Sequence, residues 1–352
     1  MQTFHLHIFA ACARAKSIKY FQSINRTIKR KMARHDMTTN TNSLIISKTP
    51  LRLPIAGGGT DILEYYTTHN GGRWISAAIS SYVYVVLKRR FEEESKFVYS
   101  ETQYVNHPSQ FNHPILRTVL TKYHLLQHIE LVSIADLPAN LGLGSSGAFT
   151  VGLLNALQTF LNKASMPKEL AEEAYEIERV SLQRRIGKQD QYAAAFGGAH
   201  IYDVSSEGNV ITAPINISAL QEWLLLFYIN RRSMSAAEAI LYISPEDQEN
   251  IGVIGAESID ALRNQNFVRY GDLMAKHWTI KSRTQPPHFS NLIDHAKHHG
   301  AISGKLCGAG QGGCILLVVP PEYRADVIKT MAITDAIHIP FSFEYSGSGV
   351  YL

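Results

Sequence analysis

A short run of glycines and hydroxyl residues has the composition of a phosphate-binding turn. The run Gly142-Leu143-Gly144-Ser145-Ser146-Gly147 follows a segment that predicts a strand, and it precedes Ala148–Leu161, whose apolar spacing predicts a helix. Glycines let the backbone approach an anion closely, and the free N–H groups at the start of a helix contribute positive potential there. The run therefore predicts a site for the phosphates of a nucleotide.

Two carboxylates downstream of this turn could complete the site of a kinase. Mg²⁺ usually takes a carboxylate together with phosphate oxygens and water, and a serine hydroxyl is a hard oxygen ligand of the same kind. A kinase also needs a carboxylate near the hydroxyl that accepts the phosphoryl group. Glu178 and Asp190 are candidates for these two roles, although spacing alone equally allows an exposed helix charge and a helix N-cap.

Two further glycine segments, Gly57-Gly58-Gly59 and Gly308–Gly313, also predict tight turns. Two runs in the chain match the G-x-G-x-x-G pattern, but a dinucleotide-binding fold also needs an acidic residue at the end of a second strand. The corresponding region, Lys163–Glu173, instead predicts the start of a helix. The P-loop pattern is absent, because Gly304-Lys305 is followed by Leu306. The sequence therefore disfavours both of these nucleotide-binding folds.

Strands are mixed with helices from Ser43 onward, and this mixture predicts an α+β or α/β fold. Predicted strands are Ser43–Pro50, the run Tyr82–Leu87 within Trp74–Arg90, Ile129–Ile134, Ala199–Val204, Trp223–Ile229, Cys314–Val319 and Phe341–Tyr345. Predicted helices are Ala148–Leu161, Lys168–Arg184 and Glu322–Met331, and the segment 231–298 is helical in character. A turn cluster at Ser205–Asn209 indicates a domain boundary between residues 205 and 220.

Three motifs occur in the order that is found in the superfamily of galactokinase, homoserine kinase, mevalonate kinase and phosphomevalonate kinase, the GHMP kinases. They are Pro50–Asp61, Pro138–Ala148 and Lys305–Cys314, and the chain resembles this superfamily over residues 43–352. The resemblance implies an α+β fold of two lobes. An ATP-binding lobe similar to ribosomal S5 domain 2 would span residues 43–215, and a ferredoxin-like lobe would span residues 216–352.

The resemblance also implies that the protein uses ATP and Mg²⁺. The residues that would bind the nucleotide are Gly142, Leu143, Gly144, Ser145, Ser146, Gly147, Gly308 and Gly310. Among the side chains, Ser146 and Glu178 would hold the Mg²⁺ ion. A metal bound in this way would share its ligands between the protein and the phosphates of the nucleotide.

A second set of residues would bind the acceptor. Asp190 would act as the base or orient the acceptor hydroxyl, and Arg52 would pair with Asp190 and stabilise the developing charge. The residues that would bind the sugar are Gly59, Thr60, Asp61, Lys188 and Arg232. The last two are candidates for contacts with a substrate phosphate, and the alternative for Lys188 is a solvated loop.

Within the superfamily, Ala56–Asp61 and Gly187–Gly198 are most similar to the D-glycero-D-manno-heptose 7-phosphate kinases. The resemblance implies ATP-dependent phosphorylation of the anomeric hydroxyl to give heptose 1,7-bisphosphate, a precursor for surface polysaccharide. It also implies a small-molecule sugar phosphate as partner, no nucleic acid, no membrane and a cytoplasmic location. The alternatives are another anomeric sugar kinase, for galactose or fucose, and a non-catalytic nucleotide- or sugar-binding regulator. The oligomeric state stays open.

Four positions carry further expectations. Gln311 interrupts a glycine run that is usually unbroken in the superfamily, so the third loop is expected to be shifted or stiffer. Gly147 replaces a more usual serine or alanine, a change that a helix start tolerates. Trp74 stands where a small aliphatic residue is common and is expected to reshape the sugar pocket. His113 lies in a Pro/Asn-rich loop and is expected to be solvated.

The net charge of +4 hides an asymmetry between the N-terminus and the rest of the 352 residues. Residues 1–36 carry eight bases and one acid, whereas the remaining chain carries 26 bases and 29 acids. A targeting peptide, a nucleic-acid arm and a non-functional extension are all compatible with residues 1–42, and the late onset of regular structure favours the extension. Three cysteines without metal-ligand spacing indicate free thiols in a reducing compartment.

Overall fold

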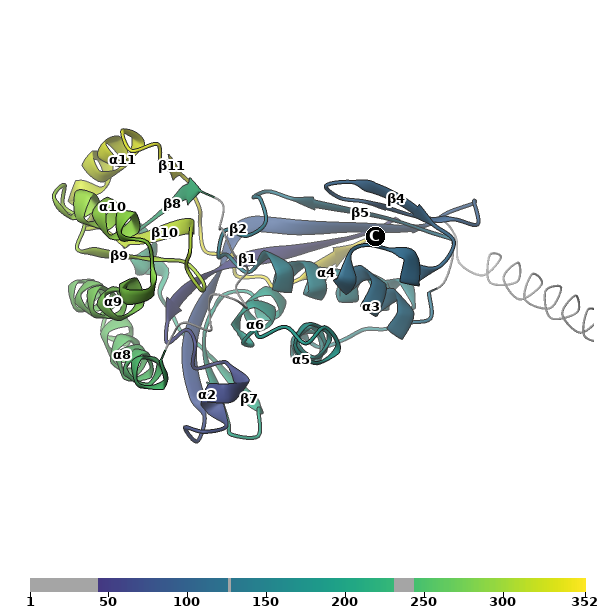
Figure 1. Ribbon diagram of the computed structural model, residues 1–352, viewed down its shortest axis with the longest axis horizontal. Helices are drawn as coiled ribbons and strands as arrows, with labels where there is room; N and C mark the ends of the chain where they lie inside the picture. The colour runs from purple at the N-terminus through teal and green to yellow at the C-terminus, as the bar shows by residue number, and fades with distance from the viewer. Residues whose placement is uncertain (1–43, 126–127, 231–243) are drawn as a thin grey trace, which may run out of the picture. The chain divides into compact units, whose positions relative to one another are not determined.

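The computed structural model describes residues 44–125, 128–230 and 244–352. The predicted extension, residues 1–42, and the predicted substrate residue Arg232 lie outside these ranges. Residues Ile45–Leu352 form one compact unit, which is built on two β-sheets (Figure 1). Among the described residues, no helix has the length and apolar character needed to cross a bilayer.

The first sheet has eight strands, and its longest strand organises it. The strand order is β12-β1-β2-β5-β3-β4, with β6 on β2 and β7 on β6. The strands are β1 (Ile45–Ala56), β2 (Gly72–Arg89), β3 (Ser95–Val98), β4 (Thr102–Val105), β5 (Ile129–Ala135), β6 (Ala199–Val204), β7 (Val210–Pro214) and β12 (Gly349–Tyr351). One half of β2 pairs with β6 and the other half with β5, so β2 extends through both parts of the sheet.

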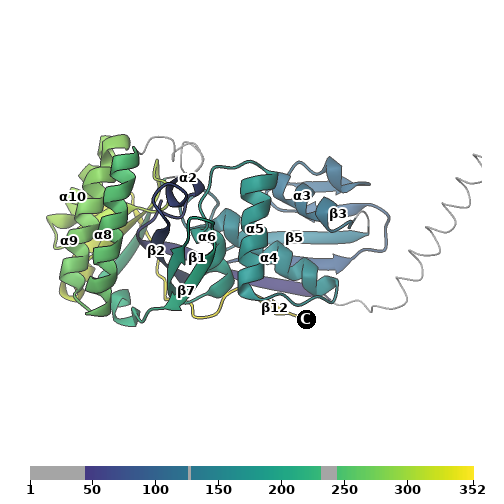
Figure 2. The same cartoon turned by 90° about the horizontal axis from the view of Figure 1, so that it is seen from below.

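Helices cover this sheet on the side that carries the predicted phosphate-binding turn. They are α2 (Leu63–Tyr66), α3 (Pro114–Lys122), α4 (Ser145–Phe160), α5 (Pro167–Glu176) and α6 (Gln189–Phe196). Helix α4 packs on β1 and β2, and α5 and α6 pack against each other (Figure 2). Because α4 is apolar around most of its circumference, it is almost wholly buried and fixes the position of its own first turn.

The second sheet has four strands in the order β11-β8-β10-β9. Its strands are β8 (Leu224–Asn230), β9 (Ser303–Leu306), β10 (Gly313–Val318) and β11 (Ile337–His338), and its helices are α8 (Pro245–Arg263), α9 (Phe267–Lys281), α10 (Pro287–Lys297) and α11 (Arg324–Ala332). The central strand β10 is fully buried, as its continuous apolar run requires. Helices α8, α9 and α10 stand side by side (Figure 2), and α9 and α10 pack on β9.

Two predicted elements differ from the structure. The predicted helix Lys168–Arg184 is α helical only to Glu176, and Ile177–Ser181 forms a π-helical turn. The predicted strand Phe341–Tyr345 is wrong, because only Phe343 forms an isolated bridge, to Ile79 of β2. The segment fills the part of β2 that lies between its pairings with β6 and β5, where there is room for a few hydrogen bonds but not for a strand.

The mixed α+β fold is confirmed. In chain order β7 ends at Pro214 and β8 begins at Leu224, so the chain passes from the first sheet to the second over residues 215–223, which only partly overlap the predicted range 205–220. The C-terminal strand β12 then returns to the first sheet and pairs with β1. The second sheet and its helices are therefore inserted between two strands of the first sheet.

Candidate active site

One cavity of about 560 Å³ brings the three glycine segments together. Its lining includes Gly58 and Gly59 of the first segment and Gly308 and Ala309 of the third. The second segment contributes Gly142, Gly144, Ser145, Ser146 and Gly147, whereas the predicted Leu143 is buried and does not line the cavity. A volume of this size suits a small-molecule ligand. The two sheets and the helices between them thus place segments that are far apart in the sequence around one space.

The second glycine segment forms a turn that leads directly into α4. Gly142 and Gly144 have φ angles of 82° and 79°, in the left-handed region that favours glycine. The first hydrogen bond of the helix runs from the N–H of Ala148 to the carbonyl of Gly144. The preceding N–H groups, at 145–147, therefore have no partner within the helix and lie at its positive end, beside the cavity.

The third glycine segment packs against the second. The N–H of Cys314 donates to the carbonyl of Leu141 at 3.0 Å, and a Cβ on Gly313 would lie 2.4 Å from the same oxygen. Gly308 lines the cavity. Gly310 is not part of the lining, because it faces Gln285, whose Oε1 would lie 2.4 Å from an added Cβ.

Gln311 adopts the backbone conformation of the glycines around it. Its φ of 63° lies in the left-handed region. Two hydrogen bonds hold it there: its N–H donates to Gln285 Oε1 at 2.6 Å, and its Nε2 donates to the carbonyl of Thr284 at 2.8 Å. These bonds tie the third loop to the residues that follow α9 and offset the cost of a non-glycine residue in this conformation.

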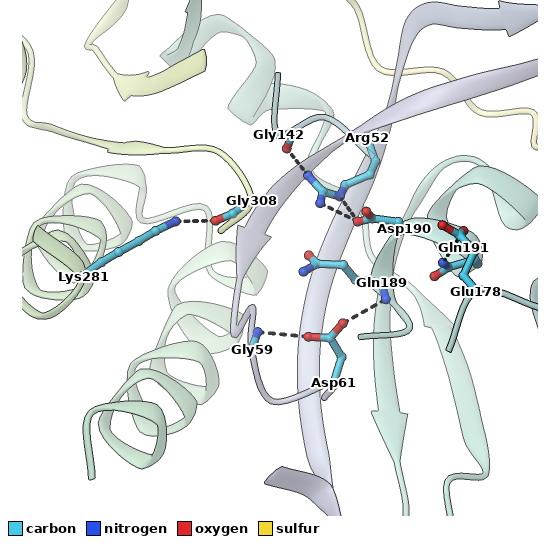
Figure 3. A network of polar contacts seen from close by, with 10 residues as sticks. All are labelled: Arg52, Gly59, Asp61, Gly142, Glu178, Gln189, Asp190, Gln191, Lys281 and Gly308. Atoms are coloured by element: carbon cyan, nitrogen blue, oxygen red, sulfur yellow. Dashed lines mark hydrogen bonds and ion pairs between the residues drawn. The ribbon is translucent and has the colours of Figure 1, made fainter. Parts of the chain in front are cut away.

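Arg52 and Asp190 meet at the centre of the site, although 138 positions separate them in the chain (Figure 3). Arg52 Nε donates to Asp190 Oδ1 at 2.8 Å, and a second guanidinium nitrogen donates to the same oxygen. The remaining nitrogen donates to the carbonyl of Gly142 at 2.5 Å. The buried arginine therefore joins the carboxylate to the phosphate-binding turn.

Gly147 provides the room for this arrangement. A Cβ at this position would lie 2.7 Å from Asp190 Cβ and 3.0 Å from the Asp190 carbonyl carbon. The helix start does tolerate the glycine, as expected, and in this chain a larger residue at 147 would clash with Asp190. The absence of a side chain lets α4 approach the first turn of α6, and this contact brings Asp190 next to the phosphate-binding turn.

Ser146 and Glu178 also lie side by side, as the sequence predicts for a pair that shares a metal. The Ser146 hydroxyl donates to Glu178 Oε2 at 2.5 Å. Thr150 Oγ1 and Gln191 Nε2 donate to the other carboxylate oxygen at 3.1 and 3.0 Å. Arg184, which sequence reasoning missed, donates to Glu178 Oε2 at 3.1 Å. Glu178 lies on the π-helical turn, a conformation often found at functional sites.

This pair of oxygen donors fits Mg²⁺ better than a transition metal. One carboxylate and one hydroxyl leave most coordination positions to phosphate oxygens and water, which is how Mg²⁺ is usually held. The described part of the chain contains no group of three or more His, Cys, Asp and Glu side chains that could hold a metal ion without a nucleotide. The residues present therefore suit an ion that arrives with phosphates.

The first glycine segment ends in Asp61, whose carboxylate faces the cavity. Its two oxygens accept hydrogen bonds from the N–H groups of Gly59 and Gln189, each at 3.0 Å (Figure 3). Burial raises the pKa of Asp61, and these backbone bonds oppose that effect. Gly187 leaves the space that the carboxylate occupies, because a Cβ there would lie 1.8 Å from Asp61 Oδ2.

Three predicted pocket residues lie elsewhere. Thr60 closes the turn, with its hydroxyl 2.8 Å from the carbonyls of Gly57 and Arg73, and does not line the cavity. Lys188 is buried outside the lining, where its ammonium pairs with Glu172 at 2.7 Å. Trp74 does not reshape the sugar pocket, because it is buried in the core and stacks on Tyr202.

The end of the cavity near β3 and β5 is apolar and aromatic. Phe97, Tyr99, His113 and Phe149 line it, and the His113 ring packs against Phe149 at 5.0 Å. His113 is half-buried and accepts a hydrogen bond from the N–H of Leu116 at 3.4 Å, so the expectation of a solvated histidine is wrong. Burial lowers the pKa of His113 to about 4, which keeps the ring neutral at pH 7.

The opposite end of the cavity is basic, and sequence reasoning missed its residues as well. His277, Lys281 and Lys305 line it. Lys305 Nζ donates to the carbonyl of Ile55 at 2.8 Å, and Lys281 Nζ donates to the carbonyls of Leu306 at 3.0 Å and Gly308. Lys305 belongs to the third motif and so could have been found. Nothing in the sequence singles out His277 or Lys281.

Comparison with known proteins adds the family. Profiles described as "GHMP kinases N terminal domain" and "GHMP kinases C terminal" match residues 112–198 and 258–334. A D-glycero-alpha-D-manno-heptose 7-phosphate kinase of Campylobacter jejuni is 29% identical over 333 residues, which cover 86% of this chain and 97% of that protein.

Solved structures share the fold over nearly their whole length. A D-glycero-D-manno-heptose 1-phosphate kinase from Bacteroides thetaiotaomicron matches with a TM-score of 0.73 and 26% identity, over 88% of this chain and 99% of that one. A Lactococcus lactis galactokinase complexed with galactose matches with a TM-score of 0.69 and 15% identity, over 93% and 99%. As the order of its three motifs predicts, the chain belongs to the GHMP kinase superfamily of ATP-dependent small-molecule kinases.

Proposed function

We propose that the protein is a sugar-1-kinase that uses ATP and Mg²⁺ to phosphorylate the anomeric hydroxyl of D-glycero-D-manno-heptose 7-phosphate. The observation that carries the proposal is the Arg52–Asp190 pair, which stands in one cavity between the phosphate-binding turn and the carboxylate of Asp61. A cytoplasmic enzyme with an ATP-binding lobe at 43–215 and a second lobe at 216–352 is part of the same proposal.

The proposed reaction is a direct in-line transfer. The acceptor oxygen bonds to the γ-phosphorus as the bond to the β–γ bridging oxygen breaks, and ADP leaves. Asp190 receives the hydroxyl proton, and Arg52 stabilises the negative charge that shifts between acceptor and phosphoryl group. Gly59 and Asp61 hold other sugar hydroxyls, because an ionised carboxylate is a strong acceptor of hydroxyl hydrogen bonds.

The nucleotide would occupy the rest of the cavity. Its base suits the aromatic end around Phe97 and Phe149, and its phosphates suit the N–H groups at the start of α4. Ser146 and Glu178 would hold Mg²⁺, which neutralises charge on the phosphate oxygens when it is bound. Arg184, next to both residues, is available to contact a phosphate once the ion takes its place on Glu178.

The choice of sugar rests on the similarity to the two heptose phosphate kinases and on the motifs Ala56–Asp61 and Gly187–Gly198. A panel of acceptors tests it. ADP release is measured with heptose 7-phosphate, free heptoses, galactose, fucose and mannose, and the product is identified by ³¹P NMR. We expect heptose 7-phosphate to give the highest kcat/KM and a phosphate on the anomeric oxygen. A higher kcat/KM for a free hexose favours a galactokinase- or fucokinase-like enzyme, and a lack of ATP turnover with every acceptor favours a non-catalytic regulator.

A further inference from the structure

The basic end of the cavity has no role in the mechanism above. Lys305 and Lys281 come from β9 and from the last turn of α9, and both are almost completely buried. Figure 3 shows Lys281 reaching toward Gly308, on the other side of the Arg52–Asp190 pair from Glu178. Two ammonium groups are thus held at the wall of a cavity whose opposite parts bind the nucleotide in the proposed function.

The surroundings of Lys305 leave positive charge near the cavity. The carbonyl of Ile55 accepts hydrogen bonds from both Lys305 Nζ and the Tyr270 hydroxyl, and a carbonyl oxygen does not neutralise a cation. No ion pair to Lys305 occurs among the residues that the structure describes. A buried ammonium without a carboxylate is unfavourable unless an anion approaches it, and the open side of this one is the ligand cavity.

The other cations of the cavity are already matched with acids. Arg52 pairs with Asp190, and Arg184 pairs with Glu178 at 3.1 Å. The two sequence candidates for a substrate phosphate do not supply a charge here, since Lys188 pairs with Glu172 outside the lining and Arg232 lies outside the described residues. Lys305, which shares this wall of the cavity with Lys281, is therefore the cation best placed to receive an anionic group of the acceptor.

The separation between Asp190 and Lys305 fits a sugar phosphate. Arg52 and Ile55 lie three residues apart on β1, which corresponds to about 10 Å of strand. The anomeric oxygen and the phosphorus of a heptose 7-phosphate are joined through about seven bonds of roughly 1.5 Å, which span about 8 to 9 Å when extended. A sugar whose anomeric hydroxyl lies at Asp190 can therefore place its terminal phosphate beside Lys305.

We propose that Lys305 and Lys281 form the subsite for the terminal phosphate of the acceptor and thereby select a phosphorylated sugar over a free one. This inference rests on the proposed function, since it assumes that the acceptor hydroxyl lies at Asp190. His277 lies in the same wall and offers a neutral ring, because burial and the charges of Lys305 and Lys281 hold its pKa well below the usual range.

The test compares two acceptors on the same preparation of the full chain. Lys305→Met and Lys281→Met are assayed at saturating ATP with D-glycero-D-manno-heptose 7-phosphate and with the free heptose. We expect the ratio of kcat/KM for heptose 7-phosphate to kcat/KM for the free heptose to fall by about 10- to 100-fold in each variant. Each substitution removes a charged hydrogen-bond donor to the phosphate but none to the sugar ring. The ratio does not depend on the fraction of protein that is folded.

Lys188→Met is the matched control, since Lys188 is as buried as Lys305, with 3% of its surface exposed, but lies outside the cavity lining. Its ratio is expected to equal that of the wild type. An unchanged ratio in both cavity variants, or a rise in KM for ATP in place of the acceptor effect, overturns the subsite and leaves the proposed function intact. A wild-type protein that does not use heptose 7-phosphate overturns the proposed function and the subsite with it.

Discussion

The side chains at the centre of the site are held by contacts on every side. Arg52 uses three nitrogens, two on Asp190 and one on the carbonyl of Gly142, and its own N–H donates to the carbonyl of Leu143 at 3.0 Å. A buried arginine with so many fixed partners loses little further freedom when a substrate binds. The carboxylate of Asp190 is therefore oriented before the acceptor arrives, which is the condition for efficient transfer by positioning.

Asp190→Asn is expected to lower kcat by a factor of about 10² to 10⁴, because the amide cannot accept the proton of the acceptor hydroxyl. Nucleotide affinity should stay nearly unchanged, since the phosphate-binding turn and Glu178 are intact. Steady-state kinetics and calorimetric titration with a non-hydrolysable ATP analogue measure the two quantities. Asp203→Asn breaks a remote, exposed pair with Arg73 and is the control. Near-normal turnover of the Asp190 variant would remove this residue from the mechanism.

The charge of Lys305 gives a pH signature. Burial lowers the pKa of Lys305 to about 8, with smaller effects of Cys307 and Arg52 in opposite directions. His277 lies near both Lys305 and Lys281, and the Tyr270 hydroxyl shares the carbonyl of Ile55 with Lys305. Tyr270 stays neutral because burial raises the pKa of its hydroxyl. The ammonium is therefore present below pH 8 and is lost as the pH rises through 8, while a sugar phosphate with a pKa near 6 keeps its charge.

Affinity for the phosphorylated acceptor is accordingly expected to fall above pH 8, by up to about tenfold per pH unit. KM values for heptose 7-phosphate and for the free heptose, measured from pH 7 to pH 10, check this. The two profiles should separate above pH 8 in the wild type and run parallel in Lys305→Met. Parallel profiles in the wild type would contradict the assignment.

At the scale of elements, the approach of two helix starts decides the geometry. In the proposed function helix α4 supplies the N–H groups for phosphates, and α6 supplies Asp190 from its first turn. The two starts meet only because Gly147 has no side chain at the point of contact. The π-helical turn after α5 has a similar effect, since it presents Glu178 to Ser146 and Thr150 of α4.

Gly147→Ala is expected to lower kcat by about 10- to 100-fold, because the added methyl group displaces Asp190 from the acceptor hydroxyl. Helix propensity alone would predict a more stable protein, because alanine is favoured over glycine by about 1 kcal/mol in a helix. Gly152→Ala is the control in the same helix: its Cβ would lie 2.7 Å from Thr49 Oγ1 and away from Asp190. Its melting temperature should fall without a selective loss of kcat, and equal kcat values for both variants would contradict the steric account.

At the scale of the whole molecule, the cavity uses residues from both sheets. The first sheet and its helices carry Arg52, Asp61 and Glu178, whereas β9 and α9 of the second carry Lys305 and Lys281. The return of β12 to β1 means that the chain cannot be divided at one point without separating strands that pair. The lining residues all belong to the compact unit Ile45–Leu352.

A chain that begins at Met37 is therefore expected to retain full activity. The residues removed include the seven net positive charges of the N-terminal segment but none of the cavity lining. Acceptor kinetics and thermal unfolding of the two chains, compared at equal concentration, measure the effect. A large loss of kcat in the shorter chain would show that residues 1–36 contribute to the active form.

The sequence by itself determined the superfamily and the mixed α+β fold, and it predicted the residues of the proposed reaction centre. Motifs of this kind are local, because the turn and the helix start that bind phosphates are continuous in the chain. Arg52, Ser146, Glu178 and Asp190 could be predicted for that reason, and the structure brings them together. Thr60 and Lys188 matched motifs as well, yet their polar groups are used inside the fold.

Only the tertiary structure decided what surrounds that centre. Lys281 reaches the cavity because α9 packs on β9, and His113 reaches it because the start of α3 packs beside Phe149. The space at Gly147 likewise depends on a helix that lies more than 40 residues further along the chain. These contacts depend on how distant elements pack, and packing depends on the complementary shapes of side chains that no local pattern encodes.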